Sequence, residues 1–129
     1  MPLESVARKF AIKEGYNVLL LNEPKSYRSM LGKLPPNVSV SSEPANESAD
    51  VIQVFVTSKK NLEDQLGKLK SLLNPKGSLW VTYPKATSKV KTDINRDIIR
   101  EFAPTVGLRA VAIISIDDAW SALRLKLAW

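Results

Sequence analysis

The chain has 129 residues, 44% of them hydrophobic, and its 19 lysines and arginines outnumber 13 acidic residues to give a net charge of +6. It contains no cysteine and no histidine. These absences exclude disulfides, thiol catalysis, a Ser-His-Asp triad, a histidine-based zinc site and a histidine phosphocarrier.

The length predicts a single domain over residues 1–129 that buries roughly two-thirds of its unfolded surface. No apolar run approaches the roughly 20 residues of a membrane span, and the N-terminus lacks a signal-peptide pattern. We therefore expect a cytoplasmic protein with no membrane partner and no metal site. The positive charge favours anionic partners, although a well-solvated basic surface explains it as well.

The first third of the chain predicts two short helices and two strands. Apolar side chains at helical spacing predict an amphipathic helix over residues 3–10. An apolar run predicts a buried strand at residues 17–21, and a serine N-cap after the next turn predicts a helix over residues 26–31. A proline-rich break leads to a short strand at residues 38–41 and a polar loop at residues 42–48.

The middle of the chain predicts a strand and the main helix. Residues 51–56 are rich in β-branched side chains, which favour strands. The helix is expected to begin within residues 58–61, with Glu63 and Asp64 in its first turn, where the helix dipole favours acids. One apolar stripe along this helix is formed by Leu62, Leu66, Leu69 and Leu73.

A turn and a strand are predicted to follow this helix directly. Asn74, Pro75 and Gly77 stand at positions where a type I turn favours each of them. Residues 78–83 have almost no polar interruption, as expected for a strand buried on both faces. This sequence of helix, turn and buried strand predicts an α/β sheet.

The C-terminal third predicts a helix and two strands. Thr92 is the expected N-cap of the helix, with Asp93 as a favourable acid in its first turn, and Pro104 is expected to end or bend it. A strand follows at residues 109–116. Residues 121–127 alternate between apolar and polar side chains, which predicts a half-buried strand antiparallel to the preceding one.

This order of elements resembles the methyltransferase variant of the Rossmann fold. Residues 72–81 (LLNPKGSLWV) are similar to the Leu-Lys-Pro-Gly-Gly-x-Leu segment of those enzymes, and residues 50–52 (DVI) to the strand before it. The resemblance implies a three-layer α/β/α sandwich around a mostly parallel sheet of about six strands, with helices on both faces. With strands numbered along the chain, it implies the order 2-1-3-4-6-5 and a C-terminal antiparallel hairpin.

The whole chain also resembles a family of short, uncharacterised bacterial proteins with that fold. The matching segments are residues 79–85 (LWVTYPK), 92–93 (TD), 107–108 (GL) and 116–124 (IDDAWSALR). The family supports a single methyltransferase-like domain over residues 1–129 and brings no established activity with it.

The loop after the first strand argues against a conventional cofactor site. S-adenosylmethionine sites in methyltransferases use glycines there, because the backbone approaches the cofactor closely. Residues 22–29 contain no glycine, and Gly32 comes too late in the chain to serve. An atypical methyltransferase that binds S-adenosylmethionine through Asn22, Glu23 and Glu43 is the alternative, although a glutamate in a polar loop is usually only solvated.

The edge where the parallel strands end is the predicted location of a ligand. Lysines gather in the loops there, beside serines at helix starts, and together they are suited to a phosphate or carboxylate. The candidate ligand-binding residues are Lys25, Ser26, Lys59, Tyr83 and Lys85. Lysines also populate solvated loops in many proteins. Nucleic acid is not favoured as the partner, because few aromatic side chains accompany these lysines.

The sequence therefore predicts an uncharacterised methyltransferase-like domain that lacks the glycine-rich cofactor loop. Its predicted role is that of a non-catalytic or unassigned binding protein for an anionic small molecule, with no cofactor. The alternative is an atypical S-adenosylmethionine-dependent methyltransferase. No residue is assigned a catalytic role, and the oligomeric state is left open.

Overall fold

The computed structural model describes residues 10, 12–23, 27, 36–42, 48–85, 93–116 and 119–128. Its strands are β1 (Asn17–Leu21), β2 (Ser39–Ser41), β3 (Ala49–Phe55), β4 (Leu73–Pro84), β5 (Leu108–Ser115) and β6 (Trp120–Leu127). Its helices are α3 (Lys59–Leu72), α4 (Arg96–Phe102) and the short 3-10 helix η1 (Ala103–Val106).

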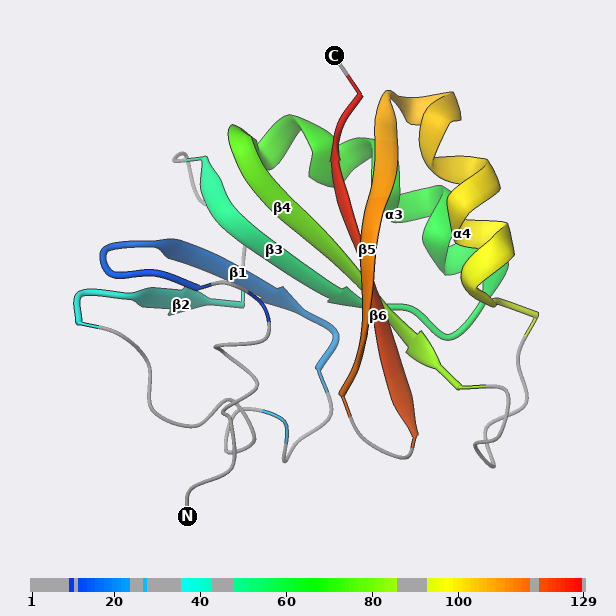
Figure 1. Cartoon of the computed structure of the whole chain (residues 1–129), viewed down its shortest axis with the longest axis horizontal. Coiled ribbons are helices and arrows are strands. Elements are labelled where there is room, and N and C mark those ends of the chain that lie inside the picture. The colour runs from blue at the N-terminus through cyan, green and yellow to red at the C-terminus, as the bar shows by residue number, and fades with distance from the viewer. Residues whose placement is uncertain are drawn as a thin grey trace.

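The strands form one six-stranded sheet in the order β2-β1-β3-β4-β6-β5 (Figure 1). Strands β1 to β4 pair in parallel, whereas β6 is antiparallel to both of its neighbours, β4 and β5. The predicted strand order and the C-terminal antiparallel hairpin are therefore confirmed.

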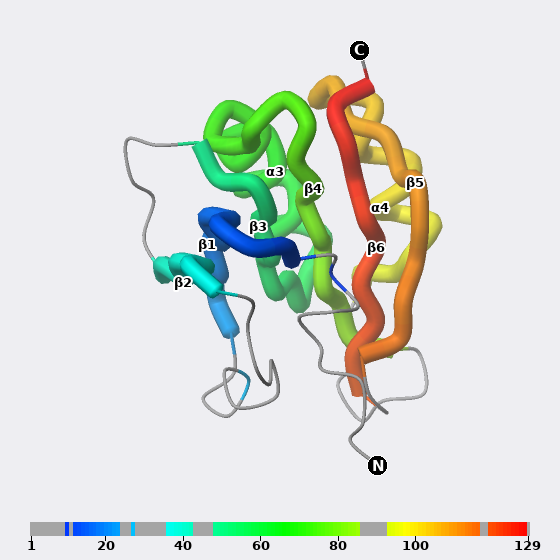
Figure 2. Tube along the Cα trace, turned by 60° about the vertical axis from the view of Figure 1, so that its left-hand side comes forward, coloured from blue at the N-terminus to red at the C-terminus, as the bar shows by residue number. Residues whose placement is uncertain are grey.

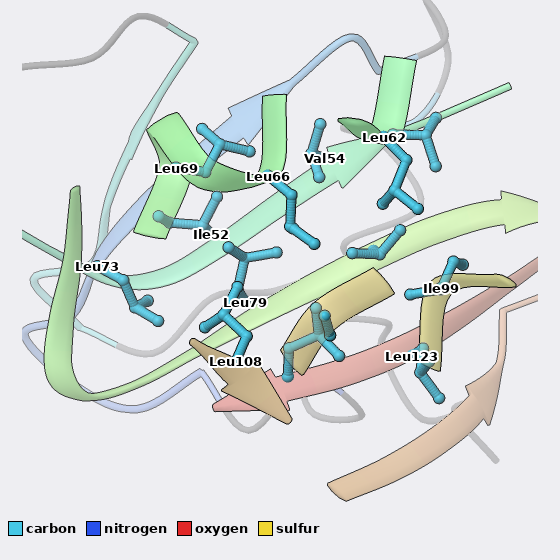
Figure 3. Packing of buried hydrophobic residues seen from close by; sticks show 14 of the residues in the cluster. Ile52, Val54, Leu62, Leu66, Leu69, Leu73, Leu79, Ile99, Leu108 and Leu123 are labelled. Atoms are coloured by element: carbon cyan, nitrogen blue, oxygen red, sulfur yellow. The ribbon is translucent and has the colours of Figure 1, made fainter. Parts of the chain in front are cut away.

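One face of the sheet packs against both α3 and α4, which lie side by side on it (Figure 2). The apolar stripe of α3 meets alternate residues of β3 and β4, and Ile99 of α4 continues the same core toward β6. Figure 3 shows this cluster, which includes Ile52, Leu62, Leu66, Leu69, Leu79, Ile99 and Leu123. The leucine stripe seen in the sequence thus forms the main core.

The opposite face carries a second apolar cluster built from aromatic rings. Phe10 contacts Trp80 edge-on with ring centroids 4.8 Å apart, and Phe55 contacts both Tyr27 and Trp120, at 4.7 and 5.0 Å. The helices predicted over residues 3–10 and 26–31 lie outside the described residues, apart from Phe10 and Tyr27. A second helical layer, and with it the full sandwich, remains a prediction.

The starts of the two main helices differ from the sequence predictions. Ser58 is the N-cap of α3 and accepts a hydrogen bond from the Asn61 N–H, so the helix begins at Lys59. The first turn contains no acidic residue, so the predicted placement of Glu63 and Asp64 there is wrong. Because Ser58 caps the helix, the first turn ends before Glu63 and Asp64.

Helix α4 begins at Arg96, later than predicted, because Asn95 caps it by accepting a hydrogen bond from the Ile98 N–H. The predicted cap, Thr92, lies outside the described residues. Asp93 precedes the helix, so its prediction as a first-turn acid is wrong. The effect predicted for Pro104 is confirmed, since α4 gives way to η1 with this proline in its first turn.

The connection from α3 to β4 is also different from the predicted type I turn. Strand β4 begins directly at Leu73, but its register with β3 jumps from Leu73 to Ser78, so residues 74–77 are skipped. The Asn74 side chain accepts a hydrogen bond from the Lys76 N–H and donates another to the Asp50 carboxylate. The asparagine thus closes a local turn inside the strand.

Strand β6 lies inside the sheet although its sequence alternates like that of a half-exposed strand. Arg124 lies over the ring of Trp80, 5.6 Å from the ring centroid, and its Nε donates a hydrogen bond to the Ser78 hydroxyl. The guanidinium group therefore lies against the face of the aromatic ring, and Arg124 remains partly exposed. This explains how a charged residue is accommodated within the sheet.

Candidate functional site

The parallel strands end at one edge of the sheet, where ligands bind in open α/β folds. The backbone turns sharply there after β1, since Asn22 adopts a left-handed conformation with φ of 61°. Its side-chain amide donates a hydrogen bond to the Gln65 side chain of α3, at 3.4 Å. The residue after β1 is therefore tied to the helix that follows β3.

The start of α3 is satisfied from within the protein. The backbone N–H of Lys59 donates a hydrogen bond to the Asp93 carboxylate at 2.8 Å, and the Ser58 hydroxyl accepts one from the Asn61 N–H in the same turn. A carboxylate at a helix start is favourable because the dipole is positive there. Asp93 thus occupies a backbone position that an external anion would otherwise use, while the Lys59 side chain extends from an exposed residue.

Three hydroxyl residues stand in a row across β4, β6 and β5. Tyr83 pairs with Ser121 across the first two strands, and Ser121 pairs with Ser115 across the last two. We call Tyr83, Ser121 and Ser115 the hydroxyl row. Tyr83 and Ser121 are buried, whereas Ser115 is exposed, so the row runs from the core to the surface.

Lys85 lies at the exposed end of the hydroxyl row. Its Nζ donates a hydrogen bond to the Ser115 hydroxyl at 2.6 Å, and its backbone N–H donates one to the Ala119 carbonyl at 2.8 Å. Lys85 is therefore anchored at the β5–β6 side of β4. The sequence named Tyr83 and Lys85, and the structure brings both of them to the same row.

Burial raises the pKa of the Tyr83 hydroxyl above its usual range, because the phenolate is poorly solvated there. Asp97 of α4 raises this pKa further. Arg96, the hydrogen bond with Ser121 and Arg100 act in the opposite direction. Tyr83 is thus a neutral hydrogen-bonding group at ordinary pH, next to the charged side chains of α4.

We expect Tyr83→Phe to reduce the loss of stability at alkaline pH. An unfolded tyrosine ionises near pH 10, whereas folded Tyr83 keeps its proton to higher pH. Stability is therefore unaffected by this group well below pH 10 and falls as the pH rises toward the folded pKa. Urea unfolding between about pH 9 and 11 measures the effect.

The control is Tyr16→Phe, which removes a phenol outside the hydroxyl row. The expected result is a flatter alkaline profile for Tyr83→Phe than for the wild type. Superimposable profiles for Tyr83→Phe and the wild type would contradict the assigned environment of Tyr83.

Three buried polar side chains form a line of hydrogen bonds that runs from the segment after β1 to β3 and β4, near the same edge. The Tyr27 hydroxyl donates to the Gln53 side-chain oxygen at 2.7 Å, and the Gln53 amide donates to the Thr82 hydroxyl at 2.9 Å. All three residues are buried, and each hydrogen bond offsets the cost of burying its groups. The signal in the sequence was Gln53, a polar residue within the apolar run of residues 51–56.

Other predicted site residues are placed less completely. Lys25, Ser26 and Glu43 lie outside the described residues. Glu23 is described and half-buried.

Among the described residues, no group of three acidic side chains could hold a metal ion. No helix in the described part of the chain is both long and apolar enough to cross a membrane.

Residues 37–128 match the family described as "Protein of unknown function (DUF3052)". Among curated proteins, none matches the chain. The comparison with solved structures therefore carries the remaining information about the fold.

Several solved structures with similar folds are described as SAM-dependent methyltransferases, and one is described as a complex with SAH. The DhpI–SAH complex is 12% identical with a TM-score of 0.64, covering 95% of this chain and 82% of that one. A TehB-like SAM-dependent methyltransferase from Corynebacterium glutamicum is 13% identical with a TM-score of 0.61, covering 95% and 85%. A SAM-dependent methyltransferase from Aquifex aeolicus is 16% identical with a TM-score of 0.59, covering 93% and 86%. At these identities the likeness shows a methyltransferase-like Rossmann fold.

Proposed function

We propose that this chain, which belongs to the DUF3052 family of proteins of unknown function, is a non-catalytic domain that binds a small anionic molecule. The observation that carries the proposal is the exposed end of the hydroxyl row, where the Lys85 ammonium group lies 2.6 Å from the Ser115 hydroxyl. An ammonium group and a hydroxyl together supply several donors for phosphate or carboxylate oxygens.

The surrounding charges support an anion at this position. Arg96 and Arg100 of α4 act on Tyr83, and Asp97 is the carboxylate that opposes them there. The Arg96 Nε and an Asp97 carboxylate oxygen are 3.7 Å apart on the exposed surface of α4, so the charge of Asp97 is largely balanced by its neighbour on the same helix. Lys85 and Arg100 then remain to attract an anion, and the net charge of +6 assists its approach.

The other candidates belong to the same proposal as contributors from neighbouring loops. Lys59 starts the helix after β3, and Lys25 and Ser26 belong to the segment after β1. Their side chains are proposed to approach the anion from the far side of β4, while Tyr83 supports the site through Ser121. No metal or cofactor is needed for this role.

We expect Lys85→Glu to abolish stabilisation by the anion. A ligand at a hundred times its dissociation constant stabilises a folded protein by about 2.7 kcal/mol. For a domain of this size, that corresponds to a rise in melting temperature of roughly 10 °C. The measurement is a thermal-unfolding panel of nucleotides, inorganic phosphates, carboxylates and polyanions with the wild type and the variant.

Lys68→Glu is the matched control, because it makes the same change of net charge on the exposed surface of α3. The proposal requires at least one anion that stabilises the wild type and Lys68→Glu but not Lys85→Glu. It is wrong if no anion in the panel stabilises the wild type, or if every shift survives in Lys85→Glu.

An atypical S-adenosylmethionine-dependent methyltransferase is the second candidate, using Asn22, Glu23 and Glu43. The left-handed backbone at Asn22 favours it, because the chain bends directly after β1 in a conformation that glycine adopts readily. The residues fit this cofactor poorly, however. Residues 22–29 contain no glycine, and the Asn22 side chain is engaged by Gln65.

Titration calorimetry with S-adenosylmethionine separates the two candidates. Binding in the micromolar range would favour the enzyme and overturn the non-catalytic assignment. An absence of heat at millimolar ligand would exclude S-adenosylmethionine as the cofactor.

A further inference from the structure

Strand β5 forms an open edge of the sheet. It is the last strand in the order and pairs with β6 on one side within the described part of the chain. Two large hydrophobic side chains are exposed among the described residues, and both belong to β5: Val111 is 39% exposed and Ile113 is 44% exposed. An edge that combines apolar side chains with unpaired backbone groups can accept a further strand.

The pairing pattern shows which backbone groups face outward. The Ile116 N–H donates to the Trp120 carbonyl, so residues alternate from there in bonding to β6. The N–H and C=O groups of Ile113 therefore point away from β6. The register shifts between Ala110 and Ala112, and this irregularity limits the length of the flat edge. The edge suits one short strand.

The charges on the last two strands of the sheet are all of one sign. Strands β5 and β6 carry Arg109, Arg124 and Lys126 and have no acidic residue. Arg109 and Lys126 stand directly opposite each other, an arrangement that is unfavourable for like charges. Arg124 bonds to the Ser78 hydroxyl and Lys126 to the Lys76 carbonyl, both of them neutral oxygens.

The two kinds of side chain lie on different faces of the sheet. Ile113 pairs with Leu123, which belongs to the core under α4, so Ile113 is on that face. Arg124 lies over Trp80 on the opposite face, and Arg109 pairs with Lys126 on the same side as Arg124. An added strand would therefore meet the apolar Ile113 on one face of the sheet and the basic Arg109 on the other.

We propose that β5 binds an extended acidic peptide segment of another protein, which joins the sheet as an additional strand. Its alternate side chains would be apolar, next to Ile113, and acidic, next to Arg109. Backbone hydrogen bonds supply affinity in this mode of recognition, and alternate side chains supply specificity. A second copy of this chain is a poor occupant, because its own β5 has no carboxylate to offer Arg109.

The test uses the full chain and a fluorescein-labelled peptide of about eight residues that alternates valine and glutamate, the length of a typical strand. Binding is measured by fluorescence anisotropy at low and high salt. Three competitors are included: a valine–lysine peptide, a fully N-methylated valine–glutamate peptide, and an oligothymidylate. N-methylation keeps the side chains but removes the donors that pair with an edge.

We expect the valine–glutamate peptide to bind and high salt to weaken its binding. Arg109→Glu and Ile113→Lys are each expected to weaken it by about tenfold, through the basic and the apolar face respectively. Lys68→Glu is the control with the same charge change away from the edge and should retain wild-type affinity. Urea unfolding of each variant checks that it is folded.

The proposal is overturned if the peptide does not bind, if the N-methylated peptide competes equally well, or if Lys68→Glu weakens binding as much as Arg109→Glu. Preferential binding of the oligothymidylate would instead identify a nucleic-acid surface. Concentration-dependent dimerisation that Ile113→Lys abolishes would identify a second copy as the occupant.

Discussion

Trp80→Ala is expected to destabilise the protein by about 3–5 kcal/mol, the range for truncating a buried tryptophan to alanine. Trp80 is 2% exposed in the centre of β4, with Phe10 packed edge-on against its ring and Arg124 above it. The truncation removes both contacts and leaves a cavity on this face of the sheet. A domain with 5–15 kcal/mol of stability would lose a large part of it.

Urea unfolding measures this loss, and two further variants make it interpretable. Trp80→Phe should cost much less, because the ring contact with Phe10 is largely kept and the buried indole N–H has no hydrogen-bond partner among the described residues. Trp120→Ala truncates a half-exposed tryptophan and is expected to cost less than Trp80→Ala. Equal losses for the two alanine variants would show that Trp80 is not a centre of packing.

Gly77→Ala is the second large expected effect, with a loss of about 3 kcal/mol from overpacking. A Cβ at this position would lie 2.5 Å from the Asp50 carbonyl oxygen and 3.1 Å from the Asn74 carbonyl oxygen. Both obstacles are backbone atoms that cannot rotate away as a side chain would. Strands β3 and β4 must therefore move apart where the register skips residues 74–77.

Gly67→Ala provides a control of opposite sign, measured by the same urea unfolding. Gly67 lies inside α3, and an added Cβ there would make an ordinary contact with Val106 at 3.7 Å. Replacing a helical glycine by alanine is expected to stabilise the protein by roughly 0.5–1 kcal/mol. If Gly77→Ala is as stable as the wild type, the close approach of residue 77 to Asp50 is wrong.

Much of the fold followed from local sequence patterns. The runs at residues 17–21 and 78–83 were predictable as buried strands because their apolar content is continuous. The strand order came from the resemblance to methyltransferases, since hydrophobic periodicity does not specify which strands are neighbours. Helix starts were less accurate, because competing polar residues such as Thr92 and Asn95 are both plausible caps, and the choice between them depends on tertiary contacts.

Only part of the candidate site could be predicted from the sequence. Tyr83 and Lys85 stood out because they lie at the end of a buried strand and directly after it. Ser115 and Ser121 were missed because they come 30 or more residues later in the chain and meet Lys85 and Tyr83 only through the antiparallel pairing of β6. Placing these serines required the register of the predicted antiparallel last strand as well as its direction. Alternation of apolar and polar residues alone does not fix that register.

The hydrogen bond between the Lys59 amide and the Asp93 carboxylate gives the molecule a built-in reporter. The first amides of a helix ordinarily exchange rapidly with solvent, because no carbonyl of the same helix holds them. The Lys59 amide is held by Asp93, which precedes α4, so its deuterium uptake reports on whether the Asp93 carboxylate keeps this position. A ligand that draws Asp93 or its neighbours toward Lys85 would speed exchange at this amide, even though the amide belongs to a different helix.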